Sequence, residues 1–239
     1  MSDNEIKLDL ERHQRIGLEE AIFCSRKSDE QIEIILGQVL EQSRSCLLTC
    51  LNSDQYARIN SNYRNLIDFD EVTQTAFFNW TERKALETQV GVVTAGSSDV
   101  PVAKEAMRTL QYFGIATLPI FDVGVAGIWR LLERVDEIRD LPVVIAAAGM
   151  DAALPSVLGG LYPGLLIAVP TSVGYGVAAG GQTALNSILA SCASGVVTVN
   201  IDNGYGAACA AIRALGLRQH ATENAAEITA ADSAATKNL

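Results

Sequence analysis

Two acidic residues and one cysteine stand out in the second half of this 239-residue chain. Asp151 and Asp202 enclose a run of uncharged residues, 152–201, and Cys192 lies within that run. A carboxylate can accept or donate a proton, and a thiolate can attack an electron-poor carbon. Taken alone, each acid is more typical of a helix cap, and the cysteine of a core thiol. Acids at ligand-side strand ends favour a functional site.

The rest of the composition restricts the chemistry of these residues. Both histidines, His13 and His220, lie in the flanks, so the central segment holds no Ser–His or Cys–His pair of its own. None of the five cysteines belongs to a CxxC pair, and no zinc-ligand spacing occurs. We therefore expect reduced thiols and no metal site.

Charge and hydropathy indicate the localisation of the protein and the classes of partner that it can bind. A net charge of −10 argues against nucleic acid as a partner. The charged segment 1–15 has no signal-peptide pattern, and prolines and glycines interrupt 152–201 before it reaches the ~20 apolar residues of a spanning helix. We expect a cytoplasmic protein with no membrane partner. An uncharged stretch of this length also predicts a homo-oligomer.

Short apolar runs in the second part of the chain predict buried parallel strands, because most of them lack polar–apolar alternation. The runs are 90–93, 115–121, 141–148, 165–169 and 196–201. Segments of helical length separate them: 100–114, 125–139, 151–161 and 176–193, with a last helix after Asn203. This alternation predicts an α/β fold with a doubly wound, flavodoxin-like, five-stranded parallel sheet whose first strand lies inside.

A small αβ module is expected ahead of this sheet. Residues 1–27 look irregular, and Ser28 with Gln31 forms a capping-box pattern before a helix. A strand over 46–51 and a second helix from Ser53 should follow. The predicted division is 1–88 for the module, 89–217 for the nucleotide-binding catalytic domain and 218–239 for a polar tail.

Ligands of open parallel sheets bind where the loops leave the carboxyl ends of the strands. After the first strand, Gly96 allows a tight turn, and Ser97, Ser98 and Asp99 offer donors and acceptors at a helix start. Such a segment suits a ribose or phosphate, although simple capping by Ser98 or Asp99 explains it as well. The later strand ends add further candidate substrate-binding residues: Asp122, Trp129, Arg130, Ser172, Tyr175, Asp202 and Asn203.

Several segments, in this order, resemble the LarB-type family of pyridinium-3,5-biscarboxylic acid mononucleotide synthases. They are AGSSDVPVAKEA, DVGVAGIWRLL, VIAAAGMDAALPSVLGGL, IAVPTSVGYG and LNSILASCASGVVTVNIDNGYGA. The resemblance covers about residues 85–215, and 15–32 resembles the family's N-terminal segment more weakly. The C-terminal half is also similar, more distantly, to PurE-type aminoimidazole ribonucleotide carboxylases and mutases, which implies a PurE-like domain and an octamer.

This resemblance implies carboxylation of the pyridinium ring of nicotinic acid adenine dinucleotide and hydrolysis of its phosphoanhydride. The hydrolysis releases AMP, and the product leads to the nickel-pincer nucleotide of lactate racemase. The family's cysteine falls on Cys192 and its acid, usually glutamate, on Asp151. Carbon dioxide or bicarbonate would be the co-substrate, no tightly bound cofactor is implied, and Mg²⁺ is a candidate for the hydrolysis step.

Trp129 stands where the family usually has histidine, and an indole cannot transfer a proton. Two alternatives therefore stay open: a PurE-like carboxylase or mutase of an aminoimidazole ribonucleotide, and a non-catalytic nucleotide-binding relative. The first depends on a histidine in the matching helix, so Trp129 argues against it. Retention of Cys192 and Asp151 argues against the second.

Overall fold

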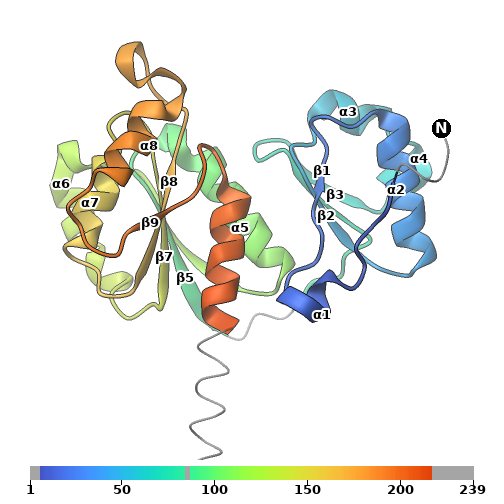
Figure 1. Cartoon of the computed structure of the whole chain (residues 1–239), viewed down its shortest axis with the longest axis horizontal. Coiled ribbons are helices and arrows are strands. Elements are labelled where there is room, and N and C mark those ends of the chain that lie inside the picture. The colour runs from blue at the N-terminus through green and yellow to red at the C-terminus, as the bar shows by residue number, and fades with distance from the viewer. Residues whose placement is uncertain (1–5, 84–86, 217–239) are drawn as a thin grey trace, which may run out of the picture.

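A computed structural model describes residues 6–83 and 87–216, and Figure 1 shows two α/β halves side by side. The N-terminal half has a four-stranded sheet of order β1-β2-β4-β3, and the C-terminal half a five-stranded sheet of order β6-β5-β7-β8-β9. All neighbouring strands of the second sheet are parallel. Its first strand in the sequence, β5, lies inside, which confirms the predicted flavodoxin-like order. The predicted tail, 218–239, lies outside the described residues.

The N-terminal half is built from short elements. Its helices are α1 (Arg12–Ile16), α2 (Asp29–Glu41), α3 (Ser53–Arg58) and α4 (Ser61–Arg64). Its strands are β1 (Ile22–Phe23), β2 (Cys46–Thr49), β3 (Ile67–Asp70) and β4 (Thr75–Phe78). The capping box is present as predicted, because Ser28 and Gln31 exchange hydrogen bonds of 3.2 and 3.0 Å. The described part of the segment 1–27 is less irregular than expected, since it contributes α1 and β1.

In the C-terminal half the expected strands form with similar limits. They are β5 (Thr88–Thr94), β6 (Ala116–Ile120), β7 (Val143–Ala148), β8 (Leu165–Pro170) and the short β9 (Val197–Thr198). The helices are α5 (Val100–Tyr112), α6 (Ile128–Leu132), α7 (Ala153–Gly159) and α8 (Gln182–Leu189), and a last helix covers residues 204–216. Short 3₁₀ turns precede or follow them: η1 (Ser97–Asp99), η2 (Val125–Gly127), η3 (Val135–Glu137) and η4 (Gly176–Gly181).

Two of the predicted helices are broken into pieces. The segment 125–139 contains η2, α6 and η3, and the segment 176–193 contains η4 and α8 only. In the second case Gly180 and Gly181 have positive φ angles of 75° and 78°, which stop a continuous helix. At its other end α8 stops at Leu189, and residues 190–196 form a loop rather than the end of a helix.

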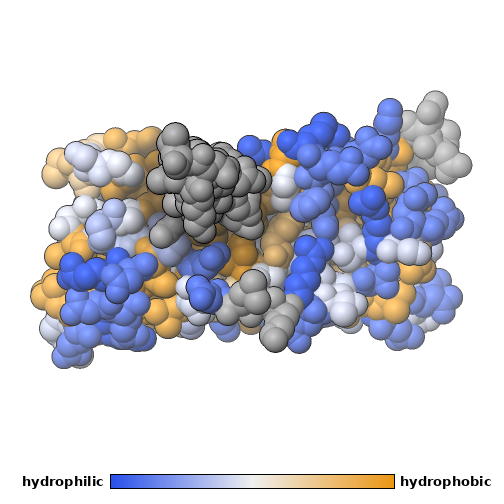
Figure 2. Space-filling view, turned by 90° about the horizontal axis from the view of Figure 1, so that it is seen from below, coloured by the Kyte–Doolittle hydropathy of each residue, from blue (hydrophilic) through white to orange (hydrophobic). Residues whose placement is uncertain are grey.

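Helices cover both faces of the parallel sheet. On one face, α6, α7 and α8 pack on apolar residues of β5, β7 and β8. On the other, α5 and the last helix pack through small residues, Ala103, Ala106, Ala207 and Ala211. No described helix is both long and apolar enough to cross a membrane. On the face shown in Figure 2, hydrophilic and hydrophobic side chains are interspersed over both halves.

The two halves meet at an aromatic junction. Tyr112, at the end of α5, is fully buried against Phe77 of β4 and Leu47 of β2. The Phe77 and Tyr112 ring centroids are 5.6 Å apart, and the Trp80 indole donates to the Tyr112 carbonyl oxygen at 3.2 Å. The N-terminal half therefore packs directly on the helix that begins at the first strand end of the parallel sheet.

Candidate functional site

A cavity of about 340 Å³ lies at the carboxyl ends of the parallel strands. Its wall comes from the segments after β5, β6, β7 and β8, as expected for a ligand site of an open parallel sheet. Of the predicted site residues, the described lining includes Gly96, Ser98, Asp99, Asp122, Arg130 and Asp151. The remaining ones, Ser97, Trp129, Ser172, Tyr175, Cys192, Asp202 and Asn203, are outside that lining.

Asp99 belongs to the frame of the site, by which we mean the side chains that hold the loops around the cavity together. Its carboxylate accepts from the Gly96 N–H at 2.8 Å and from the Thr171 hydroxyl at 2.6 Å, and the residue is 3% exposed. Both of its oxygens thus bind the protein, and they tie the turn after β5 to the turn after β8. Because a buried carboxylate needs such partners, this geometry explains why an acid stands here.

Asp122 and Arg130 form an ion pair at one side of the cavity. The Arg130 guanidinium lies 2.9 Å from the Asp122 carboxylate and packs over Gly127, where a Cβ atom would be 3.0 Å from Nε. Asp122 itself has a φ of 59°, and its N–H donates to the Thr94 hydroxyl at 3.0 Å. Arg130 is therefore held by the turn after β6, with its charge partly neutralised.

Asp151 is the carboxylate that is left free. It is exposed and lies between Met150 and Ala152, which have φ angles of 56° and 47°. The helix α7 starts only at Ala153, and no side chain caps it, so Asp151 is not the predicted helix opener. Within the described part of the chain, its carboxylate makes no hydrogen bond or ion pair. Non-glycine residues with positive φ store backbone strain, which is typical of functional sites.

A glycine that the sequence did not single out closes the wall behind Asp151. A Cβ atom at Gly149 would lie 2.3 Å from the Val173 carbonyl oxygen and 2.7 Å from the Thr171 hydroxyl. Val173 lines the cavity, and its carbonyl accepts from the Met150 N–H at 2.8 Å. A close approach between two strand ends thus requires glycine, and the only hint in the sequence is that Gly149 lies within the segment VIAAAGMDAALPSVLGGL.

The other predicted residues either form hydrogen bonds with neighbouring loops or are exposed at the surface. The Asp202 carboxylate accepts from the Ser172 N–H at 2.7 Å, and Asn203 caps the last helix through the Gly206 N–H, also at 2.7 Å. Trp129 and Tyr175 are 60% and 78% exposed. Ser97 is exposed beside Ser98. The structure thus places two aromatic rings at the surface, outside the described lining.

Cys192 lies in the loop between α8 and β9 and is exposed, which contradicts the alternative of a core thiol. The neighbouring Ser191 hydroxyl is 2.7 Å from that of Ser156 on α7. Burial, in contrast, raises the pKa of Cys24 to about 12. Of the five cysteines, Cys192 alone is exposed, but it is not brought together with Asp151 in the cavity.

The electrostatics of the cavity favour a cation. Its described charged lining consists of the carboxylates of Asp99, Asp122 and Asp151 and of a single guanidinium, Arg130. In the segments 6–83 and 87–216, no cluster of three or more His, Cys, Asp or Glu side chains could hold a metal ion. The site therefore offers one free carboxylate, a paired cation and backbone groups at a helix start.

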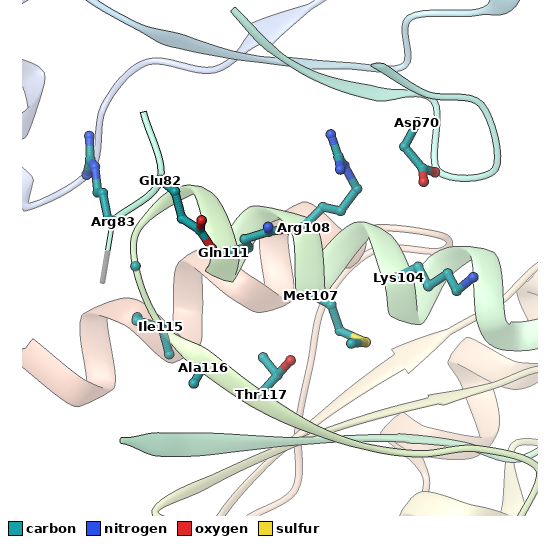
Figure 3. Close-up of a pocket in the computed structure, with 11 residues that line it drawn as sticks. Asp70, Glu82, Arg83, Lys104, Met107, Arg108, Gln111, Ile115, Ala116 and Thr117 are labelled. Carbon is teal, nitrogen blue, oxygen red and sulfur yellow. The ribbon is translucent and has the colours of Figure 1, made fainter. Parts of the chain in front are cut away.

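A second cavity, of about 670 Å³, lies between the two halves. Figure 3 shows it between one face of α5, with Lys104, Met107 and Gln111, and the start of β6. Arg108 of the same face donates to the Thr75 hydroxyl and the Asp68 carbonyl, each at 3.0 Å. This cavity is near the amino end of β6, away from the ligand edge of the sheet.

The fold and site define an α/β protein with a ligand cavity at the carboxyl ends of a parallel sheet. Residues 89–236 match the family model of AIR carboxylase, and residues 3–80 match that of the LarB/PurE-like N-terminal domain. Because the first match covers more than half of the chain, the protein belongs to the AIR carboxylase family.

Three similar proteins illustrate this relationship. An uncharacterized protein of Methanocaldococcus jannaschii is 35% identical over 86% of this chain and 82% of its own. The N5-carboxyaminoimidazole ribonucleotide mutase of Pyrococcus horikoshii is 35% identical over 56% of this chain and 76% of its own. A crystal structure of a Treponema denticola PurE2 variant has a TM-score of 0.45 and 20% identity, and covers 62% of this chain and 98% of that one.

Proposed function

We propose that the protein carboxylates the pyridinium ring of nicotinic acid adenine dinucleotide and hydrolyses its phosphoanhydride. The observation that carries this proposal is the charge of the cavity at the strand ends. Three carboxylates against one guanidinium suit a ring with a permanent positive charge, and a neutral imidazole would gain less from them. The LarB/PurE-like match of the N-terminal half supports the same substrate class.

The chemistry needs a nucleophile and a base. A Cys192 thiolate adds to the carbon beside the ring nitrogen, and the neutral enamine that results attacks carbon dioxide from its β carbon. Asp151 then takes the proton from that carbon, and expulsion of the thiolate restores the aromatic pyridinium. One C–H bond and carbon dioxide thus become a carboxylate and a proton, without an oxidant or reductant. Hydrolysis, with Mg²⁺ as a candidate aid, would release AMP.

The roles of the other residues follow from their positions. The free carboxylate of Asp151 is available as a base because it has no partner in the described part of the chain. Arg130, held by Asp122, would bind a substrate carboxylate or phosphate. The proposal requires Cys192 to approach the cavity from the loop 190–196, where its exposure leaves it accessible.

A product assay tests this proposal directly. The protein is incubated with the dinucleotide and ¹³C-labelled bicarbonate, with and without Mg²⁺, and AMP and a labelled mononucleotide are sought by mass spectrometry. Cys192→Ser should abolish the label, and Cys209→Ser, a matched change at a half-buried cysteine of the same half, should retain it. Asp151→Asn should permit the thiol adduct but stop proton removal. Substrate binding without any adduct would contradict the proposal.

The second candidate is conversion of an aminoimidazole ribonucleotide. It is favoured by the 35% identity to the mutase of Pyrococcus horikoshii. The same purified protein can be assayed with the carboxylated and uncarboxylated aminoimidazole ribonucleotides. Turnover of these, with no labelled pyridinium product, would replace the first proposal by this one.

We also propose that the protein acts as a homo-oligomer, with the octamer as the expected form. The uncharged stretch 152–201 exposes Tyr175, Val177 and Leu189, and such side chains favour contact with another copy. Light scattering at micromolar concentration should give a mass several times that of the 25.5 kDa chain. A monomer under these conditions would contradict this proposal.

A further inference from the structure

The cavity of about 670 Å³ between the two halves, here called the junction cavity, is large enough for a small organic ligand, since such sites measure about 300–1,000 Å³. One face of α5 forms a wall, and the end of β3, with Asp70, forms another. The segment after β4 contributes Glu82 and Arg83, and the start of β6 contributes Ile115 and Thr117. A ligand in this cavity would therefore contact both halves at once.

Arg108 presents a fixed cation to the junction cavity. Its Nε donates to the Thr75 hydroxyl at 3.0 Å, and its Nη2 donates to the carbonyl and the carboxylate of Asp68 at 3.0 and 3.2 Å. The guanidinium also lies over the Phe77 ring, 4.1 Å from its centroid. Nη1 has no hydrogen-bond partner among the described residues, and no buried side-chain nitrogen or oxygen of that part of the chain lacks one, so Nη1 is open to solvent. Because the guanidinium is already fixed, it loses little conformational freedom when it binds an anion.

Further polar groups without partners lie at both ends of this face of α5. Lys104, one turn before Arg108, is exposed and forms no hydrogen bond or ion pair with the described residues. Figure 3 shows Gln111 and Glu82 at the other end of the cavity, and neither side chain has a partner in the described chain. Positions 104 and 111 are two helical turns apart, about 10 Å along the helix axis. Met107 provides apolar surface between them.

The two carboxylates of the lining argue against a simple anion as the ligand. Asp70 and Glu82 would repel it, whereas they can accept hydrogen bonds from hydroxyl and amino groups. The ligand should therefore carry an anionic group for the cations, donors for the carboxylates, and an apolar ring to lie on Met107. A nucleoside monophosphate combines a phosphate, ribose hydroxyls and a heterocyclic base. We propose that the junction cavity is a second nucleotide site that binds a nucleoside monophosphate.

Each part of the ligand has its own partner in this site. Lys104 and Nη1 of Arg108 bind the phosphate, Asp70 accepts from the ribose hydroxyls, and the base lies over Met107 toward Gln111. Because the ligand contacts both halves, it stabilises their packing. The inference stands apart from the proposed function, since none of the described residues of this lining also lines the cavity at the strand ends.

Titration calorimetry with AMP at low ionic strength tests the site. Lys104→Glu should raise the dissociation constant of AMP by about tenfold or more, because a carboxylate then faces the phosphate. Lys7→Glu, the same change at an exposed lysine outside the lining, should leave the dissociation constant unchanged. Adenosine, which lacks the phosphate, should bind the wild type about tenfold more weakly than AMP does. Equal AMP affinities of the two variants, equal affinities of AMP and adenosine, or no binding of AMP to the wild type would each overturn the proposal.

Hydrogen exchange shows where the AMP binds. Amides of residues 70–75 and 111–117 should gain protection with AMP in the wild type and also in Arg130→Ala, which removes the cation of the cavity at the strand ends. Protection confined to residues 96–99 and 149–151, and lost in Arg130→Ala, would place AMP at the strand ends alone and would overturn the proposal. A failure of the proposed carboxylation would change neither measurement, so the two ideas are tested separately.

Discussion

Truncation of Tyr112 should weaken the packing between the two halves of the molecule and so lower the free energy of unfolding. The ring is fully buried, with centroid distances of 5.6 Å to Phe77, 6.5 Å to Trp80 and 5.2 Å to Phe113. Removal of a buried aromatic ring typically costs about 3–5 kcal/mol. The hydroxyl adds to this, since it donates to Glu19 at 2.5 Å. We expect Tyr112→Ala to lower the free energy of unfolding by about 4 kcal/mol.

The variant Tyr112→Phe measures the contribution of the hydroxyl group apart from that of the ring. Burial raises the pKa of Tyr112 well above its ordinary value, so the hydroxyl remains a donor at all moderate pH values. Its loss leaves the Glu19 carboxylate with Arg83, 3.0 Å away, as its remaining side-chain partner among these junction residues. We expect a cost of about 1–2 kcal/mol, which is the usual penalty for a buried group that loses one bond.

Urea unfolding followed by Trp80 fluorescence measures both changes. The background is Trp129→Phe, which leaves Trp80 as the single indole, in contact with the Tyr112 carbonyl. With a slope of about 2 kcal/mol per molar urea, Tyr112→Ala should lower the midpoint by ~2 M. Tyr175→Ala, the same change at an exposed tyrosine, should leave it nearly unchanged. A midpoint for Tyr112→Ala within ~0.3 M of the parent would refute a junction held by this ring.

Three further perturbations probe the site frame. Glu105→Gln should leave the free energy of unfolding unchanged below pH 4.5, because burial raises the pKa of Glu105 in the folded protein to about 7 and the group is protonated there. Above pH 4.5 the variant should become progressively more stable than the wild type, by at most roughly 3 kcal/mol at pH 8. Equal melting temperatures of the two proteins across this pH range would contradict this prediction. Gly149→Ala should cost about 1–3 kcal/mol and weaken ligand binding, since its Cβ would meet Val173; calorimetry and titration measure the two effects. Asp99→Asn should lower the melting temperature through loss of one buried acceptor, at a cost of about 1–3 kcal/mol, and an unchanged value would contradict its frame role.

The sequence was sufficient for the parallel sheet because its strands are continuous apolar runs separated by helix-length segments. Each of β5 to β8 coincides with a predicted run to within a few residues. The periodicity did not identify the β3–β4 hairpin of the first half. Its strands, Ile67–Asp70 and Thr75–Phe78, are joined by a turn in which the Thr73 N–H and hydroxyl both donate to the Asp70 carboxylate at 2.8 Å.

Helix ends were harder to predict than strands for a physical reason. Apolar residues at helical spacing continue from 176 to 193, but the backbone at Ala179 and Gly180 leaves the helical region. After this break the helix α8 ends at Leu189, and the loop over 190–196 exposes Cys192 instead of burying it at a helix end. Whether a residue is buried depends on where the helix begins and ends, and the types of the neighbouring residues do not show these positions.

The acids at the strand ends look alike in the sequence, and only their distant partners separate their roles. Asp99 receives its hydroxyl donor from Thr171, 72 positions away, and Asp202 receives its N–H donor from Ser172, 30 positions away. Each of these bonds commits one carboxylate to the frame of the cavity. Asp151 has no such donor within the described chain and sits on a strained turn. A base must be free to take a proton, and this is the reason why we propose Asp151, and none of the frame acids, for that role.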